Sequence, residues 1–145
     1  MKHSSVRGTD KLAIFDDEDY DRLVCLPRLS TNGRALFVGN ESVGSFVMGR
    51  AKSGYEWDHV DRNIFNNVRS NFRLATPSLN QANTKARSGY KGVYLYRGIP
   101  RAKITVNKRQ IYLGTFLSEE DAAKAYDIAA LSHFGEFAVL NFPDG

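Results

Sequence analysis

Hydrophobic and polar residues alternate with a period of two along three segments in the second half of the chain. The apolar positions are Val93 and Leu95, Ala102 and Ile104, and Ile111 and Leu113. The positions that alternate with them are polar, basic or aromatic: Tyr94, Tyr96, Arg101, Lys103, Thr105, Gln110 and Tyr112. Successive side chains of a strand point to opposite faces, so the pattern predicts a three-stranded antiparallel sheet with one apolar and one basic, aromatic face. Asn107-Lys108 suits a hairpin turn between the last two strands.

An alanine-rich segment follows and predicts a helix over about residues 119–133. Ser118 is a suitable N-cap, and the carboxylates from Glu119 to Asp121 favour the first turn. Gly135 is well placed to end the helix. The small alanine side chains allow this helix to pack closely on the apolar face of the sheet.

The first half of the chain has shorter apolar segments that predict several small elements. We expect strands over 11–15, 34–38 and 55–60, and short helices over 18–24 and 67–71. Residues 42–49 are apolar, and their pattern does not decide between helix and strand. The fold class is therefore α+β.

Two polar tracts divide the chain. Residues 1–10 are polar, and we expect a disordered tail there. Residues 77–89 are polar and basic, without aromatic residues, and we interpret them as a basic linker with a helical turn at 78–84; a plain solvated loop explains them equally well. The two domains then cover residues 11–76 and 90–145.

The charge is distributed unevenly, although the formal net charge is only +4. Residues 62–118 contain eleven Lys or Arg and no Asp or Glu. A long segment with charge of one sign indicates a surface that binds a polyanion, and the alternative is a solvated basic face. Membrane lipid is a less suitable partner, because no amphipathic basic helix carries these charges.

Cysteine content and apolar runs bear on the compartment. Cys25 is the only cysteine, so an internal disulfide and a cysteine zinc site are excluded. No apolar run approaches the roughly 18 residues of a membrane span, and residues 1–10 lack the apolar core of a secretory signal. We therefore expect a soluble intracellular protein.

One stretch gathers the most polar chemistry beside apolar residues: Trp57-Asp58-His59-Val60-Asp61-Arg62-Asn63, followed by Asn66 to Arg73. Asp58 can bind a hard divalent cation, and His59 can take a proton from water. Asn71 can add a neutral oxygen ligand, and Asn67 can hold the segment that carries the histidine. A solvated turn explains each residue taken alone.

Taken together, Trp-Asp-His, Asn66-Asn67 and Ser70-Asn71-Phe72-Arg73 resemble the HNH motif of phage and mobile-element endonucleases. The resemblance implies a small ββα-metal module in which His59 is the general base and Asn67 orients it. It also implies that Asp58 and Asn71 hold a divalent ion, Mg²⁺ or else Mn²⁺ or another divalent ion.

Two positions depart from that motif. The usual glycine of the turn after the histidine is replaced by Arg62, which is costly if the position needs a positive φ. The His-Arg pair expected about fourteen residues before Asp-His is replaced by Gly44 and Ser45.

The second half resembles the APETALA-2/ethylene-response-factor DNA-binding domain over residues 90–143. The matching stretches are Tyr90 to Val93, Ile111 to Phe116, Glu119 to Asp127, Ala129-Ala130 and Leu140 to Pro143. The resemblance implies that the sheet reads DNA through its basic, aromatic face: Tyr94, Tyr96, Arg101, Lys103, Thr105, Gln110 and Tyr112. The tryptophan of that family falls on Pro100, so the target sequence of the plant proteins does not transfer.

The two resemblances imply a metal-dependent DNA endonuclease of the homing type, whose second module recognises the site. Such a protein would act in the host cytoplasm if it is phage-encoded. We expect double-stranded DNA as the partner, no membrane and no obligate protein partner. Additional phosphate contacts are expected from Arg69, Arg73, Lys85 and Arg87. The alternatives are a nuclear transcription factor or other DNA-binding protein without catalysis and, with a looser fit, an RNA-binding accessory protein.

Overall fold

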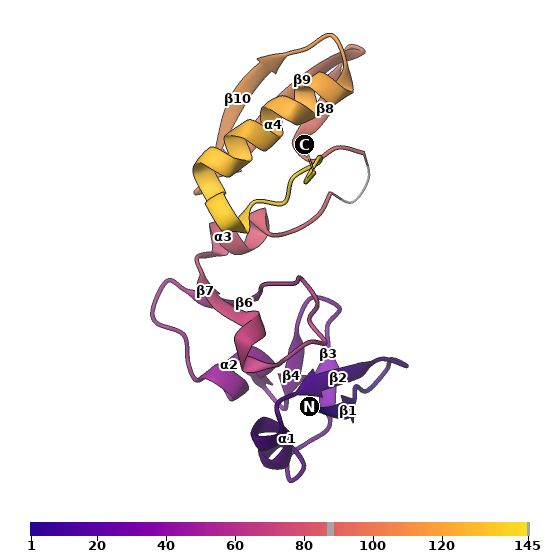
Figure 1. The fold of residues 1–145 in the computed structure, drawn as a ribbon, viewed down its shortest axis with the longest axis vertical. Coiled ribbons are helices and arrows are strands. Elements are labelled where there is room, and N and C mark those ends of the chain that lie inside the picture. Colours follow the sequence, from indigo (N-terminus) through magenta and orange to yellow (C-terminus); the bar gives the residue numbers. More distant parts are fainter. Residues whose placement is uncertain (87–88, 145) are drawn as a thin grey trace. The chain divides into compact units, whose positions relative to one another are not determined.

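A computed structural model describes residues 1–86 and 89–144 of the chain. The fold is mixed α+β, as expected, with small antiparallel sheets and helices (Figure 1). The chain divides into two compact units, Met1–Thr76 and Pro77–Gly145. No helix in the described ranges is both long and apolar enough to cross a membrane.

The first unit is built from short strands and two short helices. Its elements are β1 (Lys2–Ser5), β2 (Leu12–Phe15), α1 (Asp17–Leu23), β3 (Leu29–Thr31), β4 (Leu36–Val38), β5 (Glu41–Ser42), α2 (Val43–Met48), β6 (Glu56–His59), the 3-10 turn η1 (Arg69–Asn71) and β7 (Phe72–Ala75). Strands β1 and β2 form one antiparallel pair, β6 and β7 form a second pair, and β3, β4 and β5 form a three-stranded sheet.

The segment expected to be a disordered tail is structured in the first unit. Strand β1 pairs with β2 from Lys2↔Phe15 to Ser5↔Leu12. The N-terminal ammonium lies 2.9 Å from Asp17, and Val6 is 2% exposed. Ion pairing and one buried side chain therefore fix a segment whose composition alone suggested disorder.

The apolar segment at 42–49, which the pattern left undecided, is helical. Helix α2 begins after Ser42, whose hydroxyl accepts a hydrogen bond from the backbone N–H of Ser45. The helix expected over 67–71 is a single 3-10 turn, η1. Phe72 then continues directly into β7, because the chain pairs with β6 there.

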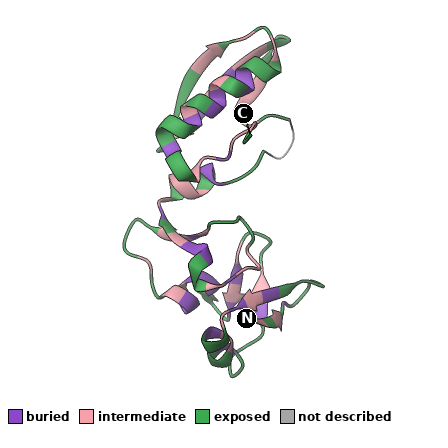
Figure 2. Cartoon of the chain, viewed as in Figure 1, coloured by how far each residue is buried: buried purple, intermediate pink, exposed green. Residues whose placement is uncertain are grey.

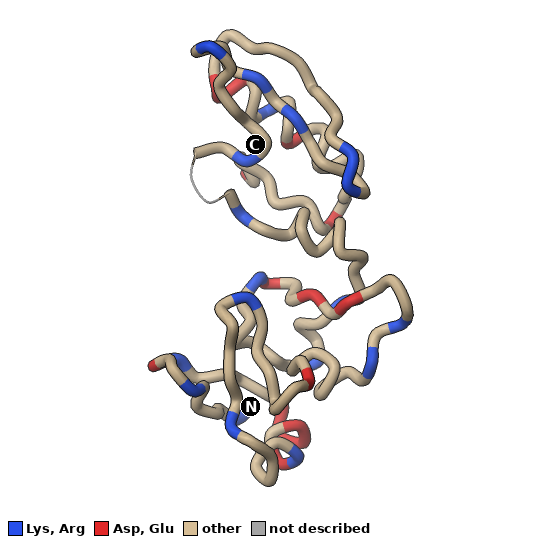
Figure 3. The backbone as a smooth tube through the Cα atoms, turned by 180° about the vertical axis from the view of Figure 1, so that it is seen from behind, with Lys and Arg blue, Asp and Glu red and all other residues tan. Residues whose placement is uncertain are grey.

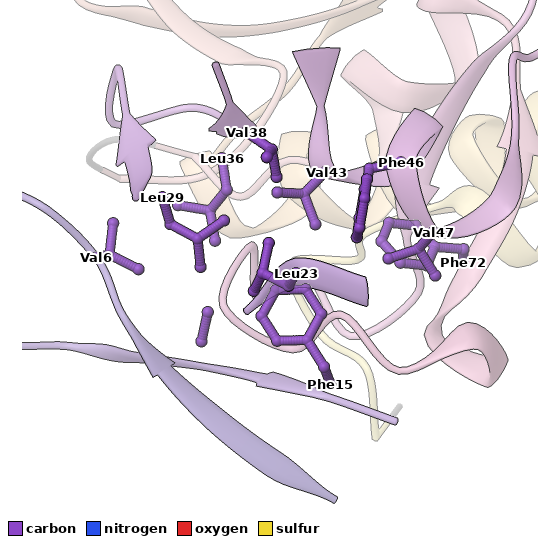
Figure 4. Packing of buried hydrophobic residues seen from close by; sticks show 11 residues of the cluster. Val6, Phe15, Leu23, Leu29, Leu36, Val38, Val43, Phe46, Val47 and Phe72 are labelled. Carbon is purple, nitrogen blue, oxygen red and sulfur yellow. The ribbon is translucent and has the colours of Figure 1, made fainter. Parts of the chain in front are cut away.

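The first unit has its own hydrophobic core. Side chains from β2, α1, β3, β4, α2 and β7 point toward one another in Figure 4. The buried members are Val6, Ala13, Phe15, Leu23, Leu29, Leu36, Val38, Val43, Phe46, Val47 and Phe72. The core holds the β6–β7 pair through Phe72, which is the strand residue nearest to η1.

The second unit contains the predicted sheet and helix. Strands β8 (Val93–Tyr96), β9 (Ile99–Val106) and β10 (Arg109–Thr115) form an antiparallel sheet with β9 in the centre. Helix α4 (Glu119–Phe134) shows one buried and one exposed side in Figure 2. Its buried residues pack with Ile104 of β9. The short turn η2 (Gly135–Phe137) follows.

Local signals at the ends of these elements act as expected. The hydroxyl of Ser118 accepts a hydrogen bond from the backbone N–H of Asp121 at 3.1 Å. Gly135 adopts a φ of 52° at the end of α4. Asn107 and Lys108 adopt φ values of 48° and 66°, which fit a tight hairpin turn.

The segment interpreted as a linker contains a helix, α3 (Pro77–Ala82). Ala82 is 5% exposed and belongs to the core of the second unit, and Leu79 packs against that core. The two apolar side chains, spaced three residues apart, give this polar tract one face that can be buried.

Gly92 marks the closest packing in the second unit. It has a φ of 78°, and a Cβ atom there would lie 1.9 Å from Cδ2 of Tyr126, which is 4% exposed. Gly89 has a φ of 62° but no atom within 4 Å of such a Cβ. Both glycines have a positive φ, which would strain a residue with a side chain, but only at Gly92 would a Cβ atom also clash with a neighbour.

We expect Gly89→Ala to destabilise the protein by about 1 kcal/mol, because alanine is strained at positive φ. Gly92→Ala should cost about 1–3 kcal/mol more, since Tyr126 must move. Chemical denaturation of the full chain measures both, and hydrogen exchange assigns the loss to the second unit. Equal losses in the two variants would contradict the packing argument.

Candidate active site and nucleic-acid interface

The β6–β7 pair positions the Asp-His motif. Asp58 lies opposite Arg73, and His59 lies opposite Phe72. The rings of Trp57 and His59 lie 6.5 and 4.7 Å from the ring of Phe72, on the core side of the pair. Strand alternation places Asp58 on the other side, where its Oδ2 accepts a hydrogen bond from Nε of Arg73 at 3.0 Å. The structure therefore directs the two motif side chains to opposite faces.

The structure brings His59 and Asn67 together. Nε2 of His59 lies 3.0 Å from Oδ1 of Asn67, which is fully buried. Nδ2 of the same amide donates to the carbonyl of Ile64 at 3.1 Å, which fixes the amide orientation. Oδ1 must then accept, so the neutral imidazole carries its proton on Nε2 and its lone pair on Nδ1. Nδ1 is thus the nitrogen that can act as a base.

Asp61 organises the loop between His59 and Asn71. Its Oδ1 accepts from the backbone N–H of Asn63 and from Nδ2 of Asn71, both at 2.8 Å. Its Oδ2 accepts from Nδ2 of Asn66 at 2.7 Å. Burial alone would raise the pKa of the Asp61 carboxyl, but these hydrogen bonds, with the charge of His59, hold the pKa below its ordinary value. The Asp61 carboxylate therefore helps to hold the loop in its folded conformation.

Strand β2 holds the other side of this loop. The backbone N–H of Ile14 donates to the carbonyl of Phe65 at 2.7 Å, and the backbone N–H of Asn67 donates to the carbonyl of Ile14 at 2.8 Å. Asn67 is thus fixed by its backbone to the core and by its side chain to the histidine.

The acidic start of α1 binds the end of the loop. Asp19 is fully buried and accepts from Nε and Nη2 of Arg69, both at 2.8 Å, and from Nη1 of Arg22 at 2.9 Å. The backbone N–H of Arg69 donates to Asp16. The acidic cluster therefore fixes η1 to α1.

The four basic residues expected on phosphate have different surroundings. Arg69 and Arg73 form ion pairs within the first unit, with Asp19 and Asp58. Lys85 is exposed in the second unit, and Arg87 lies outside the described residues.

The residues expected to hold a divalent ion differ in how well they fit. Asp58 supplies one carboxylate, and Mg²⁺ sites often use one or two, with water and substrate phosphates completing the set. Oδ1 of Asn71 already accepts from the backbone N–H of Asp61 at 3.1 Å, and its Nδ2 also donates to the carbonyl of Asn66. In the described parts of the chain, no group of three or more His, Cys, Asp or Glu side chains could hold a metal.

Both departures from the HNH pattern have a structural counterpart. Arg62 adopts a φ of 64°, and its backbone N–H donates to the carbonyl of His59 at 3.0 Å, so this turn does require the left-handed conformation. Gly44 lies where α2 meets Trp57 and Phe72, and a Cβ atom there would lie 2.9 Å from Cβ of Trp57. A histidine at position 44 would not fit in this packing.

In the second unit, the register places the predicted DNA-reading residues on one face of the sheet. Tyr94 lies opposite Arg101, Tyr112 opposite Lys103, and Gln110 opposite Thr105. Ala102 and Ile104, which alternate with them on β9, are buried. The predicted set is Tyr94, Tyr96, Arg101, Lys103, Thr105, Gln110 and Tyr112. Figure 3 shows Lys and Arg along the strands of this unit.

The sequence alone did not identify several residues that contribute to the loop around His59 or to the exposed face of the sheet. Asp61 and Asn66 received no role, although Asp61, Asn63 and Asn66 have the short spacing typical of loops in which side chains bind the backbone. On the sheet, Ile99 and Thr115 share the face of Arg101, since they pair with Tyr96 and Arg101. A β-bulge between Tyr112 and Gly114 shifts the register, and no pattern in the sequence predicted it.

Comparison with known proteins supports both resemblances. The chain is 36% identical over 96 residues to an uncharacterized HNH endonuclease of Acanthamoeba polyphaga mimivirus, and the match covers 66% of this chain and 51% of that protein. The chain thus spans about half the length of this viral relative.

It is also similar to AP2-like ethylene-responsive transcription factors of Arabidopsis thaliana. One is 44% identical over 66 residues, which covers 38% of this chain and 13% of that protein. An ethylene-responsive transcription factor of the same plant is 39% identical over 74 residues, 43% of this chain and 17% of its own length. No protein-family model matches the chain. The homologues confirm the combination of HNH-like and APETALA-2-like sequence.

We expect Arg62→Gly to stabilise the protein by about 0.5–1 kcal/mol, because glycine relieves the left-handed strain while losing more entropy on folding. Arg62→Ala removes the same side chain and keeps the strain, so it should give no comparable gain. Chemical denaturation at neutral pH compares the variants, and a gain as large in Arg62→Ala would point to the charge instead of the backbone.

The lowered pKa of Asp61 predicts a contribution to stability that is complete above the ordinary aspartate pKa of about 3.9 and is lost as the pH falls through the folded-state pKa. Asp61→Asn should therefore flatten the acid side of the stability profile. The free energy of unfolding measured from neutral to acidic pH tests this, with Asp10→Asn as the comparison at an exposed carboxylate. An unchanged profile in Asp61→Asn would contradict the assignment.

Proposed function

We propose that the chain is a metal-dependent DNA endonuclease of the HNH type. In this proposal the first unit hydrolyses phosphodiester bonds and the second unit binds the DNA. The homology to an HNH endonuclease and to AP2-like transcription factors supports both halves. The observation that carries the catalytic half is the hydrogen bond between His59 and Asn67, which leaves Nδ1 as the basic nitrogen.

In the proposed reaction, Nδ1 of His59 removes a proton from water, which attacks the phosphorus in line with the leaving 3′ oxygen. Asn67 holds the imidazole in the required tautomer. Asp58 and Asn71 would hold a divalent ion, Mg²⁺ or else Mn²⁺. Such an ion supplies charge stabilisation at the phosphate when it is bound. The P–O3′ bond breaks and the leaving 3′ oxygen takes a proton from solvent water, so the cleaved strand ends on a 3′ hydroxyl and a 5′ phosphate.

The ion pair between Asp58 and Arg73 favours a second candidate function. If Arg73 keeps this carboxylate, the chain is a DNA-binding protein without catalysis. Binding of DNA or a cation would have to draw the two side chains apart in the enzyme, because Arg73 and a cation compete for the same charge.

We expect the full chain to nick supercoiled plasmid in Mg²⁺ or Mn²⁺. His59→Ala should lower the rate by at least a hundredfold, in line with the loss of a general base, and EDTA should abolish nicking. His133→Ala is the matched control, since His133 is exposed on α4, and it should cut at the wild-type rate.

Binding measured in parallel by gel shift separates the two candidates. The enzyme is supported if His59→Ala binds like wild type but does not cut. Wild-type protein that binds plasmid but cuts it in neither metal supports the binding protein.

A further inference from the structure

Arg101 lies at the centre of an aromatic and basic cluster on the exposed face of the sheet. Its guanidinium carbon is 4.2 Å from the ring centroid of Tyr96 and 5.9 Å from that of Tyr112. Nζ of Lys103 lies 5.1 Å from the ring of Tyr94, and the guanidinium of Arg97 lies 5.4 Å from that of Tyr96. Rings from both outer strands, β8 and β10, therefore hold a side chain of the central strand.

One edge of this guanidinium is covered. Nε of Arg101 is buried and has no hydrogen-bond partner, and no other buried side-chain nitrogen or oxygen in the described ranges shares that condition. Arginine offers a partner two parallel donors, from Nε and one Nη or from the two Nη atoms. Because Nε is covered, a partner in front of the sheet would be met by the Nη1–Nη2 edge.

The position on β9 decides which partner this edge fits. Arg101 lies on the central strand, between rings of both outer strands, and a sheet of this kind can enter the major groove. Guanine presents O6 and N7 side by side in that groove, and two parallel N–H donors match this pair. A phosphate needs only positive charge, which Lys103 and Arg97 supply beside Tyr94 and Tyr96.

We propose that Arg101 is the residue that selects a guanine in the DNA bound by the second unit. This inference rests on the proposed DNA binding and does not depend on catalysis. Nη1 and Nη2 donate to O6 and N7 of one guanine, while Tyr96 and Tyr112 hold the guanidinium in place before DNA arrives. Lys103 contributes affinity without sequence preference.

The first experiment is a selection from random double-stranded DNA with the full chain. Wild type should enrich a site with at least one fixed guanine. Arg101→Lys keeps the charge but lacks the paired donors, so it should keep the salt dependence of binding and lose the preference at that guanine. Lys103→Ala is the matched control: it should weaken binding to all sequences alike and lower the salt slope by about one.

The second experiment replaces that guanine by 7-deazaguanine, which lacks the N7 acceptor. The replacement should weaken wild-type binding about tenfold or more and leave the affinity of Arg101→Ala unchanged. Far-UV circular dichroism establishes that each variant is folded.

Equal weakening of wild type and Arg101→Ala by 7-deazaguanine, or enrichment of sites without a fixed guanine, overturns the assignment to Arg101. Absence of any DNA binding by wild type overturns the proposed DNA binding itself, and the assignment with it.

Discussion

The hydrogen bond between Nε2 of His59 and Oδ1 of Asn67 is the contact on which the proposed chemistry depends. Its geometry follows from a loop whose polar side chains form hydrogen bonds with one another and with the backbone. Asp61 collects three donors, and Ile14 of β2 fixes the backbone on both sides of the loop end. An imidazole held in one tautomer loses little freedom when it must act as a base, so the ordered loop would favour the proposed chemistry.

The use of carboxylates separates the two units. In the first unit Asp19, Asp58 and Asp61 each bind cationic or amide groups of the same unit, and Arg69 and Arg73 are thereby engaged. On the exposed sheet face of the second unit, Arg101 and Lys103 lie against tyrosine rings. Tyrosine rings do not neutralise a positive charge, whereas carboxylates do. This face of the sheet therefore retains a positive electrostatic potential, which attracts phosphate.

Period-two alternation and capping signals were sufficient to predict the sheet and α4 of the second unit, because both depend on short-range pattern. They failed where tertiary contacts decide. The tail at residues 1–10 forms β1 because β2 and α1 supply partners, and the 77–89 tract contains α3 because Ala82 reaches a core.

The Asp-His motif marked the correct pair of strands, but not the opposite faces of Asp58 and His59, nor the role of Asp61. Those features depend on which residue of β7 lies opposite each residue of β6 and on hydrogen bonds within the loop. The order of neighbouring residues in the sequence does not reveal either. Arg69 and Arg73 were interpreted from charge alone as phosphate contacts, and their partners lie 50 and 15 residues earlier in the chain.

Arg62, Arg97, Asn107 and Lys108 adopt left-handed conformations that glycine would adopt more easily. Three of these four carry a positive charge at a turn. Selection for thermal robustness alone would replace them by glycine, and the protein would lose cations at the tips of its hairpins. Directed evolution for thermostability alone should therefore yield variants that bind polyanions more weakly, unless DNA binding is selected at the same time.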